Sequence, residues 1–119
     1  MKPSEAKEAK IFDRAYLETQ VSGNTGIVRE LLVIAASEIP QQIAALTHAC
    51  AHNPAEIKNA AHKLKGASYN MGFNILGNLA REIELMTLST DLSVYTDYLT
   101  RIRNEWTEIL KIINSEKKV

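Results

Sequence analysis

His62 is the residue of this sequence whose type and neighbours most readily support chemistry. It lies in the segment Ala61-His62-Lys63-Leu64-Lys65-Gly66-Ala67-Ser68. A glycine inside a helix costs about 0.5–1 kcal/mol relative to alanine, so Gly66 indicates that the space one turn after the imidazole must stay open. Residues three and four apart share a helix face, which places Lys65 and Gly66 on one side of the ring and Lys58 on the other. An exposed imidazole bordered by ammonium groups suits a group that receives an anion from a large partner.

The rest of the chain must supply the helices that hold this segment. Apolar residues recur with the 3.6-residue helical period and predict helices at about residues 11–21, 25–51, 54–71, 75–88 and 92–115. The short connections between them predict antiparallel neighbours. We therefore expect an all-α fold, an antiparallel four-helix bundle with a short additional N-terminal helix. Residues 1–10 are polar and are expected to fray, so that residues 11–119 form the domain.

Local signals refine these helices. Pro40 falls inside the second helix and predicts a kink there or a break one residue earlier. Asn53, Pro54 and Glu56 resemble a capping box at the start of the third helix. Gly72-Phe73-Asn74 and Ser89-Thr90-Asp91 should separate the last three helices. The positions that we expect to face the core are Ile27, Leu31, Ile34, Ala35, Ile39, Ile43, Leu46 and Ala49, then Ile57, Ala60, Ala61, Leu64, Ser68 and Met71, then Leu76, Leu79, Ala80, Ile83 and Met86, and finally Val94, Tyr98, Ile102, Trp106, Ile109, Ile112 and Ile113.

The hairpin around Phe73 predicts a partner for the histidine. His62 is eleven residues before Phe73 and Glu84 is eleven after it. In antiparallel helices that rise about 1.5 Å per residue, both lie about 16 Å from the turn and therefore at one level. A carboxylate that accepts the Nδ1 proton would fix the tautomer, orient the ring and raise the basicity of Nε2. By the same arithmetic Lys65 and Arg81 lie level, so that two cations would flank an incoming anion.

Composition limits the function classes. The chain has 119 residues, with acidic and basic residues balanced at 14 each, so no net field favours nucleic acid or an anionic membrane. A single cysteine excludes an internal disulfide and is compatible with a reducing compartment. No apolar run approaches the length of a bilayer span, and the charged amino terminus lacks a signal-peptide apolar region. We expect a soluble cytoplasmic domain, monomeric, without direct contact to membrane or nucleic acid.

The motif resembles the histidine phosphotransfer (HPt) domains of multistep two-component phosphorelays. The family pattern is a histidine, a hydrophobic residue two positions later, then lysine, glycine, a small residue, another glycine and a spaced leucine. This sequence matches it with His62, Leu64, Lys65, Gly66, Ala67, Ser68, Gly72 and Leu76. The segments Ile11-Phe12-Asp13-Arg14-Ala15-Tyr16-Leu17 and Val28-Arg29-Glu30-Leu31-Leu32 resemble the opening of such domains. The likeness covers about residues 11–113 and is weakest in the last helix.

The resemblance implies a phosphocarrier without kinase activity of its own. His62 would accept phosphate at Nε2 from a receiver-domain aspartate, or pass it to one, with Lys65 and Glu84 assisting; Glu84 stands where the family has Gln or Glu. Supporting or docking roles would fall to Gly66, Ser68, Tyr69, Arg81 and Lys58, although Lys58 also fits an ordinary solvated charge and Tyr69 a cover for the hairpin. The partners would be receiver domains of response regulators or of a hybrid histidine kinase. The domain would bind no cofactor itself, and magnesium would belong to the receiver. The chain fits either a free protein or the cytoplasmic C-terminal module of a membrane-bound hybrid sensor kinase.

Two other function classes compete with this interpretation. A helical adaptor could bind receivers without accepting phosphate, but such an adaptor would be expected to have replaced His62. A small enzyme or metal binder could use His62 and Glu84 as a dyad, but a convex bundle face lacks the pocket that most substrates need. His48 and His52 have the i, i+4 spacing of a metal pair; Cys50 lies on another face and no carboxylate joins them, so we expect no metal site.

Overall fold

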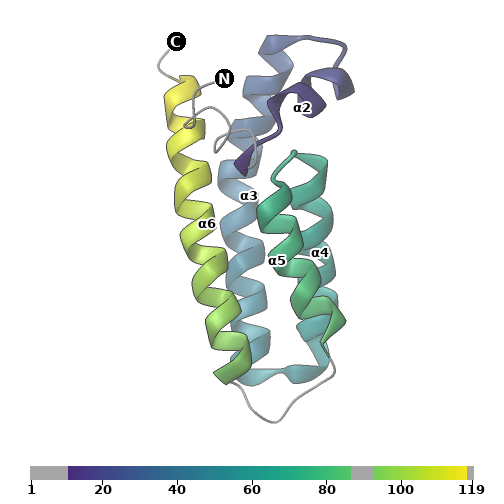
Figure 1. Ribbon diagram of the computed structural model, residues 1–119, viewed down its shortest axis with the longest axis vertical. Helices are drawn as coiled ribbons and strands as arrows, with labels where there is room; N and C mark the ends of the chain where they lie inside the picture. The colour runs from purple at the N-terminus through teal and green to yellow at the C-terminus, as the bar shows by residue number, and fades with distance from the viewer. Residues whose placement is uncertain (1–10, 87–92, 118–119) are drawn as a thin grey trace.

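The chain folds into a bundle of four long helices with a short helix across one end (Figure 1). The computed structural model describes residues 11–86 and 93–117, and all regular structure in these residues is helical. The elements are α2 (Arg14–Gln20), α3 (Thr25–His52), the 3₁₀ turn η1 (Pro54–Glu56), α4 (Ile57–Asn70), α5 (Asn74–Leu85) and α6 (Ser93–Lys117). Helices α3 to α6 run side by side, and α2 lies beside the first turns of α3 (Figure 1). The predicted all-α bundle with a short additional helix is confirmed.

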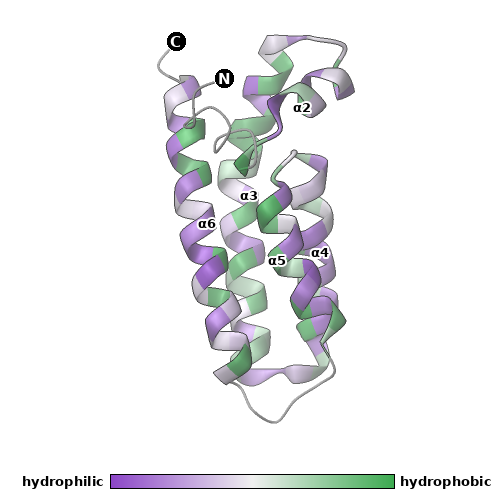
Figure 2. Cartoon of the chain, viewed as in Figure 1, coloured by the Kyte–Doolittle hydropathy of each residue, from purple (hydrophilic) through white to green (hydrophobic). Residues whose placement is uncertain are grey.

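One apolar core runs along the inside of the bundle. Large apolar side chains from all four long helices contribute to it. Along each helix they alternate with polar residues, which Figure 2 shows as green and purple bands on α5 and α6. The fully buried large residues are Leu17, Leu32, Ile39, Leu46, Leu64, Phe73, Leu76, Ile83, Tyr95, Ile102, Ile109 and Ile113. The expected inward positions of α4 and α5 therefore belong to this core or border it.

The inward face differs from the predicted one at the start of α3 and of α6. Ile27 and Ile34 are 39% and 49% exposed, whereas Val28 and Leu32 are buried. In α6 the expected Val94 is exposed, and the neighbouring Tyr95 is buried instead. Adjacent residues of a helix lie about 100° apart, so where two apolar residues are consecutive, packing against the other helices decides which of them is buried.

The start of the first helix and the course of the chain at Pro40 also need comparison with the predicted ones. Helix α2 begins at Arg14 and not at Ile11, because the Asp13 side chain caps it by accepting a hydrogen bond from the Tyr16 amide at 3.0 Å. Of the two predicted alternatives at Pro40, a kink or a break one residue earlier, the break is absent, because α3 runs through Pro40. Pro40 is on an exposed face, where water can bond the carbonyl that lacks a partner. Helix α5 ends at Leu85. The expected extension to residue 88, the break at 89–91 and the fraying of residues 1–10 lie outside the described residues.

The predicted capping box at Asn53 is wrong. The Asn53 side chain makes no capping bond, and residues 54–56 form the 3₁₀ turn η1, so α4 begins only at Ile57. Asn53 already ends α3, since its amide donates to the Ala49 carbonyl at 2.9 Å. The Asn53 backbone, at φ −145° and ψ 76°, is outside the β-region that an N-cap residue usually adopts.

The segment before α2 packs against the turn between α4 and α5. Phe12 is buried, with its ring centroid 5.5 Å from that of Phe73, and the Asp13 amide donates to the Gly72 carbonyl at 2.8 Å. Gly72 has φ +78°, a left-handed conformation that glycine adopts without strain. Arg14 then bonds Glu18 at 2.8 Å and also pairs with Glu116 of α6. The hairpin turn is thus held from outside by the N-terminal segment.

Replacing Gly72 by alanine should destabilise the fold by about 1–3 kcal/mol, which is the range for a non-glycine residue held at positive φ. The upper part of this range is expected, because an added Cβ would stand 2.7 Å from the Asp13 carbonyl oxygen. The measurement is urea unfolding followed by circular dichroism. Gly66→Ala is the matched control: a Cβ at Gly66 meets nothing within 4 Å, so this variant should be up to about 1 kcal/mol more stable. Equal stability of Gly72→Ala and wild type would contradict the strain argument.

Candidate functional site

Helices α4 and α5 bring His62 and Glu84 into contact. The imidazole Nδ1 of His62 lies 2.9 Å from Oε1 of Glu84, although 22 residues separate the two in sequence. The turn at Gly72 and Phe73 reverses the chain midway between them, so the level predicted by hairpin arithmetic is confirmed. The His62 side chain is 64% exposed, whereas that of Glu84 is only 14% exposed. A largely buried carboxylate therefore holds a largely exposed ring.

The same carboxylate also binds a lysine. Oε2 of Glu84 lies 2.8 Å from Nζ of Lys65, whose side chain is 25% exposed. Glu84 therefore bridges an imidazole and an ammonium group that lie one helical turn apart on α4. The expectation that Lys65 borders the histidine is confirmed, but its ammonium group is directed to the carboxylate.

The charge of Glu84 fixes the proton on the imidazole. The hydrogen bond from Lys65, followed by that from His62, lowers the pKa of the Glu84 carboxyl below its ordinary value of 4.5 and outweighs its desolvation. At neutral pH Glu84 is ionised and can only accept hydrogen bonds. Nδ1 of His62 must then be the donor, and in the neutral ring Nε2 keeps its lone pair. The exposed nitrogen is the one that can attack an electrophile.

The helix face beyond His62 is open at one turn and closed at the next. A Cβ at Gly66 would meet nothing within 4 Å. Tyr69, seven residues after His62, lies with its ring over Gly77 of α5, where an added Cβ would stand 2.5 Å from a ring carbon. The Tyr69 hydroxyl donates to Oδ1 of Asn78 at 2.6 Å. Tyr69 thus covers the hairpin and is fixed there, at the far side of the gap that Gly66 leaves.

Sequence reasoning missed Asn78 and Gly77 as the partners of Tyr69. The signal was present, since Tyr69 is four residues before Phe73 and the other two are four and five after it. The hairpin arithmetic that paired His62 with Glu84 also places these residues level.

The remaining residues predicted for the site divide into exposed and buried ones. Lys58 and Arg81 are exposed, and none of the ion pairs found in residues 11–86 and 93–117 involves either of them. Ser68 is fully buried and its hydroxyl donates to the Leu64 carbonyl at 2.7 Å. It can therefore support the helix but cannot touch a partner.

A hollow of about 540 Å³ lies beside the Glu84 carboxylate, between the start of α4 and the end of α5. Its lining is mostly apolar, and Leu85 at its edge is 65% exposed. Lys58 and Glu84 are the charged residues among those that line it, which are Pro54, Ala55, Ile57, Lys58, Ile83, Glu84, Leu85, Met86 and Tyr95. Leu85 and Met86 are further surface residues that sequence reasoning did not assign to the site.

Residues 11–86 and 93–117 contain neither a cluster of metal ligands nor a membrane-spanning helix. No three His, Cys, Asp or Glu side chains converge there as metal ligands. His48 and His52, at the end of α3, have ring centroids 5.0 Å apart. Among the same residues, no helix combines the length and apolar character of a membrane span.

Comparison with known proteins gives one match. Residues 30–111, well over half of the chain, match the family model of the Hpt domain. Neither a curated protein nor a solved structure matches the sequence. The matched range contains α4 and α5 completely and therefore both His62 and Glu84.

Replacing Glu84 by glutamine should remove a stabilisation that depends on pH. Because the pKa of Glu84 is lower in the folded chain than in the unfolded one, the folded chain binds fewer protons near pH 4. The contribution of Glu84 is complete well above pH 4.5 and is lost as the pH falls through the folded-state pKa. At pH 7 we expect Glu84→Gln to be about 1 kcal/mol less stable than wild type.

The measurement is urea unfolding of both proteins between pH 7 and pH 3. The difference between the two unfolding free energies isolates Glu84 from the other carboxyl groups, which titrate in both proteins. The difference should shrink toward pH 3. A difference that stays constant over this range would show that the carboxylate charge does not stabilise the fold.

Proposed function

Because the chain belongs to the Hpt domain family, we propose that His62 is the phosphoacceptor of a two-component phosphorelay. Its Nε2 would receive a phosphoryl group from the aspartate of a receiver domain, or return it to one. The observation that carries the proposal is the 2.9 Å contact between Nδ1 and Glu84 on an otherwise exposed ring. It supplies a fixed tautomer with the nucleophilic nitrogen toward solvent.

The proposed transfer forms one bond to phosphorus and breaks another. The Nε2 lone pair forms the N–P bond while the bond from phosphorus to the aspartate oxygen breaks, and the carboxylate leaves with the electron pair. The ring then carries the phosphoryl group at Nε2 and keeps its proton at Nδ1; Glu84 accepts a hydrogen bond from this Nδ1–H and its negative charge stabilises the positive ring. In the reverse direction the proton at Nδ1 lets the ring leave as neutral imidazole. Positioning and electrostatics dominate such transfers, because the transition state is loose.

Lys65 is the cation that would assist the transfer. Its ammonium group is held 2.8 Å from Glu84, one turn from the ring, and can turn toward phosphoryl oxygens that arrive at Nε2. A unit charge pair at 4 Å is worth about 1 kcal/mol in water and about 4 kcal/mol at an effective dielectric of 20. The larger value requires a partner that covers the site, which agrees with a domain that transfers phosphate only in a complex. The receiver would also supply the magnesium ion.

The docking surface would extend along α4 on both sides of His62. On one side Gly66 leaves a gap that ends at Tyr69, which is fixed by Asn78. On the other side lie Lys58 and the hollow with the exposed Leu85. A receiver can thus bring its aspartate to Nε2 without a steric obstacle and bury apolar surface beside it.

Replacing His62 by glutamine should abolish labelling and leave the fold intact, because the side chain is exposed and glutamine suits a helix. The test is incubation with a phosphorylated receiver domain, followed by measurement of acid-labile, base-stable label on the protein. The matched controls are His48→Gln and His52→Gln, both exposed, which should be labelled as wild type is. Label that persists on His62→Gln would move the acceptor to another residue. Receiver binding without label on the wild-type protein would favour an adaptor.

Replacing Gly66 by glutamine should slow transfer, because a long side chain would fill the gap that the receiver enters. Gly66→Ala, which adds a single methyl group to open space, should transfer at nearly the wild-type rate and is the matched control. The measurement is the rate of single-turnover transfer from a phosphorylated receiver. A wild-type rate in Gly66→Gln would contradict the clearance argument.

A further inference from the structure

A second hollow lies in the groove between α3 and α6 and has no place in the proposed phosphotransfer. It is a shallow groove, open to solvent, with a volume of about 600 Å³. Ten residues line it: Pro40, Ile43, Ala44, Thr47, His48, Ala51, His52, Arg103, Trp106 and Thr107. None of them belongs to α4 or α5, so an occupant would touch neither His62 nor Glu84.

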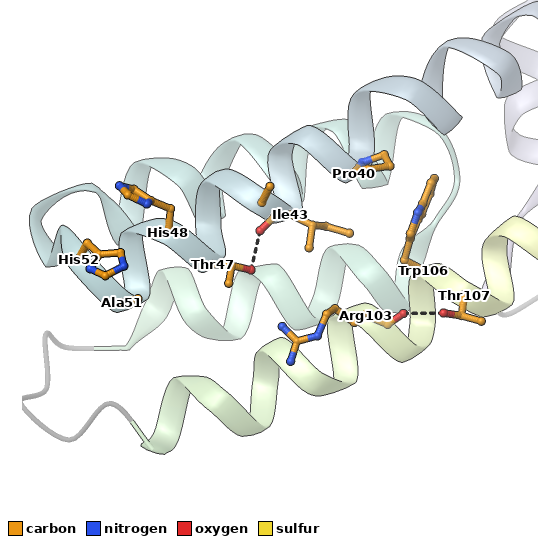
Figure 3. A pocket seen from close by; sticks show the side chains of 10 residues that line it. Pro40, Ile43, Thr47, His48, Ala51, His52, Arg103, Trp106 and Thr107 are labelled. Carbon is orange, nitrogen blue, oxygen red and sulfur yellow. Dashed lines mark hydrogen bonds between the residues drawn. The ribbon is translucent and has the colours of Figure 1, made fainter.

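The two ends of the hollow differ in chemistry. Figure 3 shows Pro40 and Trp106 at one end, His48 and His52 at the other, and Arg103 between them. On α3 the apolar and the imidazole ends are separated by twelve residues, or about 18 Å of helix. An occupant that contacts both Arg103 and the apolar end must be amphipathic.

The polar lining of the groove favours an anion. Arg103 supplies a permanent positive charge, and no aspartate or glutamate is among the lining residues. The two threonine hydroxyls already donate to carbonyls of their own helices, Thr47 to Ile43 at 2.8 Å and Thr107 to Arg103 at 3.0 Å. The donors that remain for a ligand are the guanidinium group and the imidazole rings. None of the ion pairs in the described residues uses Arg103, whose bond to the Thr100 hydroxyl is long at 3.5 Å.

We propose that this groove binds a small amphipathic anion, an apolar chain with a carboxylate head. The head would lie at Arg103, between the two ends of the groove, and the chain would extend over Ile43 toward Pro40 and Trp106. The charge of the lining selects the head, and the apolar end selects the chain.

Trp106 provides a direct readout, because it is the only tryptophan of the chain and lines the hollow. Dodecanoate, kept below its micellar concentration, should change the Trp106 fluorescence saturably with a Kd below about 1 mM. Dodecan-1-ol, which has the same chain without the charge, should bind more weakly. Arg103→Ala should weaken dodecanoate binding about tenfold, the loss expected for a hydrogen bond to a charged group.

Two further variants separate the groove from other surfaces. Arg101→Ala removes an arginine of the same helix that does not line the hollow and is paired with Asp97 at 3.2 Å, so binding should stay at the wild-type level. Ala44→Leu fills the hollow from an exposed helix position and should abolish binding. Circular dichroism checks that each variant is folded.

Three results would overturn the proposal: no saturable change with dodecanoate, equal affinity in Arg103→Ala and wild type, or unchanged affinity in Ala44→Leu. Labelling of His62 by a phosphorylated receiver should be the same in all these variants. Failure of the groove site and failure of the phosphotransfer role are therefore measured independently.

Discussion

The site depends on one carboxylate shared between two helices. Glu84 lies 2.9 Å from the imidazole of His62 and 2.8 Å from the ammonium group of Lys65, so one buried anion orients the ring and holds the neighbouring cation. Both contacts cross from α5 to α4 and therefore depend on the register of this hairpin. The register depends in turn on the turn at Gly72, whose left-handed conformation and close contact with Asp13 leave no room for a side chain.

The contacts of Glu84 with His62 and Lys65 would also allow a helical bundle to carry out the proposed phosphotransfer without a catalytic pocket. The nitrogen that would react faces solvent, where charges are screened and the lysine contributes little. Covering the ring with a partner removes water and strengthens every charge interaction around it. In the proposed function the fold would supply a prepared nucleophile, and the remaining electrostatic stabilisation would arise in the complex. A rigid Tyr69 and an open Gly66 beside the ring are consistent with a surface shaped for such a cover.

The contact between His62 and Glu84 could be predicted from the sequence, because it follows from residue spacing within the α4–α5 hairpin. Phe73 stands midway between His62 and Glu84, and counting from it gives their level without knowledge of the other helices. The predictions that were wrong concern choices between neighbours. Ile27 and Val28, or Val94 and Tyr95, are consecutive apolar residues, and periodicity alone does not tell which one faces the core. Asn53 carried a capping signal but is used to end the preceding helix.

The sequence by itself determined the helical class, the position of His62 in its motif and the carboxylate that faces it, because helical period and turn position are local properties. Only the tertiary structure decided that Glu84 also holds Lys65, that Tyr69 is fixed by Asn78, and that α3 and α6 leave a hollow at Arg103 and Trp106. These features depend on side-chain directions and on how closely helices far apart in sequence approach each other. Packing of the whole core sets both, and no single segment encodes them.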